Sequence, residues 1–179
     1  MNLSPKQREQ IEKKANILLT DMRKYDDTFW GVNLDVLAAH FGFDIYETEM
    51  PDILQGDIQV DGSRRVIRVN INCTHELKRF IIAHEFGHFY TAETAQQSRL
   101  YIRESRKDIH YGKSIIEEEM DYFAACILMP ENSFRHAYRV LRRRNETAIS
   151  RTLAQLFNVP LESVVRRIDE LGLVEKQFM

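Results

Sequence analysis

Two histidines four residues apart, His84 and His88, constrain this chain more than any other feature of its sequence. They lie in the stretch 80–88, FIIAHEFGH, which contains no proline. If this stretch is helical, both imidazoles lie on one face and can bind one metal ion from the same side. Glu85 is then a neighbour of the ligands, and its carboxylate can reach a metal-bound water as a general base.

The residues before the motif support a helix with an inward face. Thr74 and Glu76 are typical of a helix start, and Leu77 and Ile81 lie on the same stripe as the two histidines. Imidazoles on an otherwise apolar, inward stripe need polar partners. A metal ion supplies them. Because the HExxH pattern also arises by chance, the interpretation needs a further ligand elsewhere in the chain.

The stretch 115–129 predicts a second long helix, which ends at Pro130 and offers such a ligand. Of its three successive glutamates, only Glu117 shares a face with another acid one turn later, Asp121. A run of glutamates is usually solvated, but this helix is strongly apolar, and an inward acid pair needs a cation. Glu117 can be the third metal ligand, and Asp121 can accept the remaining N–H of a liganding histidine.

The ligand types favour zinc, although manganese or iron can also bind two histidines and a carboxylate. The pattern is unlike the extended metzincin motif, because Thr94 stands where the third histidine of that motif would fall. Between the two helices, the polar stretch 91–114 predicts a loop or partly helical excursion. It carries three side chains that could reach an active site: Tyr101, His110 and Tyr111.

Composition sets broad limits on the class of protein. The 179 residues are 44% hydrophobic and 29% charged, with a net charge of −2, which suits one domain or one domain with a small appendage. No apolar run is long enough for a membrane span, and residues 1–10 are too polar for a signal peptide. The two cysteines, Cys73 and Cys126, form no disulfide framework. We therefore expect a cytoplasmic protein in which Cys126 is a small core residue.

The remaining patterns predict an α+β fold with a short mixed or antiparallel sheet. Ser4 begins a capping box with Pro5 at the first helical position, and Asn33 caps a second helix that ends at Gly42. Alternating apolar residues predict three strands, at 43–47, 56–60 and 66–71, the last two joined by a hairpin turn. Ile67, Val69 and Ile71 are expected on one face of the last strand. A sheet edge beside the site could pair with an extended substrate peptide, or the hairpin could be purely structural.

Beyond Pro130 the chain predicts three helices, so we divide it into a metallopeptidase-like domain, 1–130, and a helical C-terminal subdomain, 131–179. Two of these helices are joined in a way that resembles a helix-turn-helix. The segment 131–171 holds eight arginines against five acids. This imbalance favours a solvated helix surface over a nucleic-acid patch. The residues expected inward on the last two helices are Ile149, Leu153, Leu156, Phe157, Val164, Val165, Ile168 and Leu171.

These motifs resemble the ImmA/IrrE-type HExxH metallopeptidases of bacteria and their mobile elements. The matching stretches are 67–70 (IRVN), 79–88 (RFIIAHEFGH), 117–130, and the tail from Leu153 to Leu173. The resemblance implies a zincin-like fold in which His84, His88 and Glu117 bind zinc and Glu85 is the base. It also implies a protein substrate, because family members include proteases that cleave helix-turn-helix repressors of phages and integrative elements.

Two functions remain open from the sequence. The first is a zinc endopeptidase acting on a protein, for which the two-part ligand set is the main support. The second is a regulatory module that binds DNA or protein and has a structural or residual metal site, supported by the basic tail. A structural zinc site usually has a fourth Cys or His ligand, and the sequence offers no obvious one. We therefore favour the enzyme.

Overall fold

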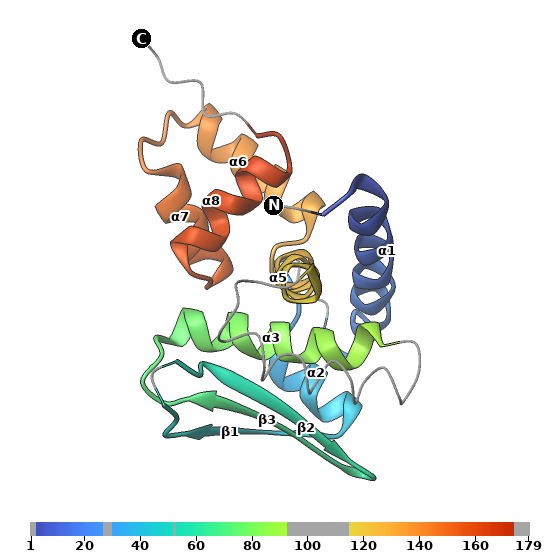
Figure 1. Cartoon of the computed structure of the whole chain (residues 1–179). Helices are drawn as coiled ribbons and strands as arrows, with labels where there is room; N and C mark the ends of the chain where they lie inside the picture. The colour runs from blue at the N-terminus through green and yellow to red at the C-terminus, as the bar shows by residue number, and fades with distance from the viewer. Residues whose placement is uncertain (1–2, 27–29, 52, 93–114, 174–179) are drawn as a thin grey trace.

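Helix α3 (His75–Thr91), which carries the HExxH motif, lies between the sheet and helix α5 (Ile115–Leu128) in the computed structural model (Figure 1). The structure describes residues 3–26, 30–51, 53–92 and 115–173. Its described part has seven helices and a three-stranded mixed sheet, which confirms the α+β class. Among these residues, no helix is both long and apolar enough to cross a membrane.

The other elements follow the predicted order closely. The remaining helices and the strands are α1 (Pro5–Met22), α2 (Leu34–Phe41), α6 (Glu131–Arg143), α7 (Ile149–Phe157), α8 (Leu161–Glu170), β1 (Phe43–Thr48), β2 (Gly56–Asp61) and β3 (Arg64–Asn70). Figure 1 shows α1 beside α5, and α6 to α8 gathered on the side of α5 away from the sheet.

Local signals explain why the helices begin and end where they do. The Ser4 capping box is formed, with the Ser4 hydroxyl accepting from the Gln7 N–H. Asn33 caps α2, Thr74 caps α3, and Gly42 ends α2 in the left-handed region at φ 69°. These capping residues were all predicted from the sequence, because caps depend on contacts within a few residues.

The sheet has the order β1-β3-β2, so β3 is its middle strand and β2 lies at an edge. β1 runs parallel to β3, whereas β2 and β3 form the predicted antiparallel hairpin. Ile58, Ile67 and Val69 are buried among the core residues. The prediction for Ile71 was wrong: β3 ends at Asn70, and Ile71 is 47% exposed.

The C-terminal helices share one hydrophobic core with the rest of the chain. Phe134 and Phe157 belong to the same cluster of buried residues as Phe123 of α5, and the Trp30 ring packs edge-on against Phe157 at 5.7 Å. The division of the chain at residue 130 stays a prediction.

The inward residues of α7 and α8 were only partly predicted. Leu153, Phe157, Val164, Ile168 and Leu171 are buried. Leu156 and Val165 were expected inward but are 40% and 54% exposed. On α8 the buried face instead includes Arg167, which is 2% exposed and donates to the Met129 carbonyl. A hydrogen-bonded arginine therefore occupies a position that apolar periodicity assigns to a hydrophobic residue.

Gly87, inside the HExxH motif, allows α3 and α5 to approach closely. A Cβ at this position would lie 3.0 Å from Cδ1 of Phe123 and 3.1 Å from Sδ of Met120. Both of these α5 side chains are fully buried, so neither has space into which it can withdraw. The absence of a side chain at residue 87 therefore sets the spacing between the two helices.

We predict that Gly87→Ala lowers the free energy of unfolding by about 1–3 kcal/mol through overpacking. At an exposed helical position the same change typically stabilises by up to about 1 kcal/mol, so the sign of the effect is informative. Urea unfolding followed by circular dichroism measures it. A variant at least as stable as the wild type would show that the α3–α5 contact is not close-packed at Gly87.

Candidate metal centre

The side chains of His84, His88 and Glu117 converge where α3 faces α5. Nε2 of His84 lies 3.2 Å from Nε2 of His88 and 3.0 Å from Oε2 of Glu117, and Nε2 of His88 lies 3.3 Å from Oε1 of Glu117. The three groups form a cluster that could hold a metal ion, with one candidate atom from each within 4.8 Å of the others.

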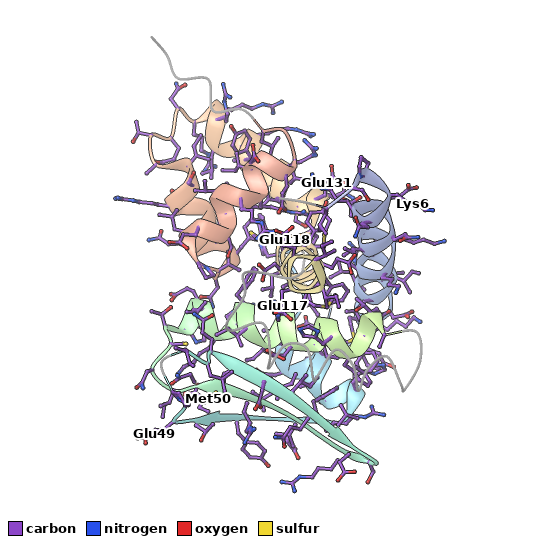
Figure 2. The ribbon with its side chains drawn as sticks, viewed as in Figure 1. Lys6, Glu49, Met50, Glu117, Glu118 and Glu131 are labelled. Carbon is purple, nitrogen blue, oxygen red and sulfur yellow. The ribbon has the colours of Figure 1, made fainter. Side chains whose placement is uncertain are left out.

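The two helices bring these groups together by simple periodicity. The four-residue spacing places both imidazoles on the face of α3 that meets α5. Glu117 lies in the first turn of α5 and, in Figure 2, between α5 and α3, whereas Glu118 lies on the side of α5 away from α3. This arrangement is the one expected for the single glutamate that shares a stripe with Asp121.

Asp121 lies one turn after Glu117 and contacts the other nitrogen of His84. Its Oδ1 is 3.0 Å from His84 Nδ1. If Nδ1 carries the proton and donates to this carboxylate, the lone pair of Nε2 faces His88 and Glu117. That tautomer of His84 is the one that could bind a metal ion through Nε2.

The electrostatics of the cluster match a cation site. Burial lowers the pKa of His84, but its contacts with Asp121 and Glu117 outweigh burial and raise that pKa to about 10. Burial raises the pKa of Glu117, yet contacts with His84 and His88 hold it well below its usual range. In the metal-free protein the acids therefore stabilise positive charge on His84. A metal ion would replace that proton.

The donor set and its spacing fit zinc. Two imidazole nitrogens and one carboxylate are the protein ligands of several catalytic zinc sites. Ligand atoms about 2.1 Å from a tetrahedral zinc are about 3.4 Å apart, close to the separations of 3.0–3.3 Å between the three groups. If these three groups bind zinc, a fourth position would remain for water or substrate.

Glu85 lies next to the cluster but is not part of it. It is 5% exposed, and its Oε2 is buried with no hydrogen-bond partner among the described residues. Burial raises the pKa of Glu85 and outweighs the two histidines, which lower it. A raised carboxylate pKa is suited to a general base that works near neutral pH.

An open cleft of about 530 Å³ is lined by His84, Glu85 and Glu117. Its lining includes the segment from Ile53 to Gly56, at the start of the edge strand β2, and residues of α8 from Glu162 to Arg166. The edge strand beside the site is thus β2, whereas the strand that leads into the HExxH helix, β3, is internal. Gly56 allows β2 to lie close to α3, because a Cβ at residue 56 would lie only 2.4 Å from Cγ2 of Ile81.

Two contributors to the site were not predicted from the sequence. Arg166 of α8 donates to Oδ2 of Asp121 at 3.2 Å. Asn70 of β3 is 3% exposed, and its side-chain amide donates to the carbonyls of Met50 and Leu54, which fixes the segment before β2. No local pattern marks either residue, because both act through contacts distant in sequence.

Other sequence expectations concern residues around the centre. Cys126 is a buried core residue, and burial raises the pKa of its thiol to about 11, which does not suit a nucleophile. Tyr101, His110 and Tyr111, like Thr94, lie outside the described residues.

We predict that purified protein binds about one zinc ion per chain through the HExxH histidines and Glu117. His88→Ala and Glu117→Ala should each reduce bound zinc to well below one per chain, because each removes one of three protein ligands. Metal analysis by mass spectrometry after dialysis measures the content. Glu118→Ala is the matched control on the same helix and should retain zinc. Equal loss in the Glu117 and Glu118 variants would contradict the assignment.

Comparisons with known proteins agree with this architecture. No curated protein shows significant similarity to the chain. Among solved structures, a Mycobacterium tuberculosis transcriptional regulator has a similar fold, with a TM-score of 0.55 and 17% identity over 98% of this chain and 50% of that one. The chain thus spans half the length of that regulator. The model of the Peptidase M78 family, described as the IrrE N-terminal-like domain, matches residues 36–169. This chain therefore belongs to the IrrE-like Peptidase M78 family, as its motifs suggested.

Proposed function

We propose that this chain is a zinc-dependent endopeptidase that hydrolyses a peptide bond in a protein substrate. The observation that carries the proposal is the convergence of His84, His88 and Glu117 at an open cleft, with the buried carboxylate of Glu85 beside them. Membership of a peptidase family supports a metallopeptidase-like function.

In this proposal each residue has one role. His84, His88 and Glu117 hold the ion, and Asp121 orients His84. Bound zinc would polarise the scissile carbonyl and acidify a water molecule near Glu85. As this water attacks the carbonyl carbon, Glu85 takes a proton from the water. Glu85 then gives the proton to the leaving amine.

The cleft suits an extended peptide. Its walls combine apolar side chains, including Leu54, Phe80 and Ile81, with polar groups from α8. The start of β2 lies at the sheet edge beside Glu85. An extended substrate could add to this edge through main-chain hydrogen bonds, which would place its scissile bond over the ion.

We propose a helix-turn-helix transcriptional repressor of a phage or mobile element as the substrate. Support comes from the ImmA/IrrE-type resemblance, because family members include proteases that cleave such repressors. A repressor substrate would place the reaction in the cytoplasm.

A DNA- or protein-binding module is the second candidate, since α7 and α8 are joined by a tight turn at Asn158, in the left-handed region at φ 52°. In a helix-turn-helix the second helix reads the DNA. Here two arginines of that helix contact the protein itself: Arg166 donates to Asp121, and Arg167 to the Met129 carbonyl. These contacts favour the peptidase. Salt-dependent, sequence-selective DNA binding by the full chain would favour the alternative.

We predict that Glu85→Gln retains zinc and the wild-type fold but lowers proteolysis by roughly 10²- to 10⁴-fold, since it removes only the general base. The readout is N-terminal proteomics of cells expressing either protein, because this method detects cleavage in any protein of the cell. The wild type should generate a new N-terminus within a helix-turn-helix regulator, and the variant should not.

Metal analysis of both proteins provides the control, because zinc loss in Glu85→Gln would itself explain inactivity. Identical new N-termini in both samples would contradict the role of Glu85. A new N-terminus in an unrelated protein would support the endopeptidase and overturn only the substrate class.

A further inference from the structure

The carboxylate of Asp121 is held on both sides by groups from different helices. Its Oδ1 contacts Nδ1 of His84 on α3 at 3.0 Å, and its Oδ2 accepts from Nη1 of Arg166 on α8 at 3.2 Å. The Asp121 side chain is only 10% exposed. Contacts at both oxygens restrict rotation of the carboxylate, so Arg166 influences the direction in which Asp121 accepts from His84.

Arg166 is itself held in place within α8. Its Nε lies 3.1 Å from Oε1 of Glu170, whose side chain is 1% exposed. The other oxygen of Glu170 lies 3.4 Å from Nη1 of Arg167, and Nε of Arg167 donates to the carbonyl of Met129, just after α5. A continuous series of polar contacts thus connects the end of α5, through α8, back to Asp121 on α5.

We propose that Arg166 is a positioning residue for the metal centre, acting through Asp121 to orient His84. The guanidinium neutralises the carboxylate and fixes it against His84, so that Nε2 of His84 faces Glu117 and His88. Partners behind a metal ligand commonly set its orientation and basicity. This inference rests on the proposed zinc site and assigns a role in it to the C-terminal helices.

A direct role in substrate binding is the competing explanation for Arg166. Its side chain is 35% exposed and lines the cleft. The two roles differ in one measurable respect. A positioning residue changes zinc affinity when no substrate is present, whereas a substrate-binding residue changes only the Michaelis constant.

The test is the dissociation constant for Zn²⁺ of the full chain, measured by competition with a chelating dye. Arg166→Gln should weaken binding about 10-fold, the lower end of the 10- to 100-fold effect typical of partners behind a metal ligand. Arg166→Lys keeps the charge but not the fork that reaches both Asp121 and Glu170, so its loss should be smaller. Arg151→Gln, an exposed arginine of α7, is the matched control and should bind like the wild type.

A double-mutant cycle tests whether Arg166 acts through Asp121. Asp121→Ala should weaken zinc binding, and adding Arg166→Gln to it should cause no further loss, because the intermediary is already absent. Circular dichroism of the metal-free proteins checks folding. If Arg166→Gln does not fold, Arg166→Lys in both backgrounds provides the same cycle.

The outcomes separate this inference from the proposed function. If the wild type binds no zinc, both are overturned. If the wild type binds zinc and the Arg166 variants bind it equally well, only the role of Arg166 is overturned. Independent, additive losses in the double variant would also overturn it, because they would show an effect that bypasses Asp121.

Discussion

The close contact between α3 and α5 is the interaction on which the candidate site depends. α3 contributes His84, His88 and Glu85, whereas α5 contributes Glu117 and Asp121. The two imidazoles and the Glu117 carboxylate lie 3.0–3.3 Å apart at their nearest atoms, and they could share one ion only while the helices keep this spacing. α3 also packs on the sheet, whereas α5 packs against α1 and is contacted by Arg166 of α8.

The site combines charges that would be costly to bury separately. Two imidazoles, two glutamates and an aspartate lie within one partly buried region, and burial of isolated charges is strongly unfavourable. In the metal-free protein the acids compensate by stabilising positive charge on His84. With zinc bound, the ion would take over that role. This cluster of groups could hold a cation, which supports the proposed metal site.

The sequence predicted the parts of the structure that depend on local periodicity. The helix caps, the hairpin and the four-residue spacing on α3 and α5 all follow from neighbours in the chain. Oδ1 of Asp121 lies 3.0 Å from Nδ1 of His84, and its predicted role behind a metal ligand stays a prediction. Arg166 was missed because its contact with Asp121 spans 45 positions. Val165 was wrongly expected to be inward, because the spacing of apolar residues cannot show that Arg167 occupies the buried face of α8.

In the proposed site one zinc ion binds between α3 and α5, in a catalytic type of site. A crystal structure of the zinc-loaded protein, with diffraction recorded on both sides of the zinc absorption edge, tests this most directly. The expected result is one anomalous peak about 2.0–2.2 Å from Nε2 of His84, Nε2 of His88 and a carboxylate oxygen of Glu117, with a fourth position held by solvent. A peak at other residues, or no peak in a folded protein supplied with zinc, would overturn the assignment of His84, His88 and Glu117 as the zinc ligands.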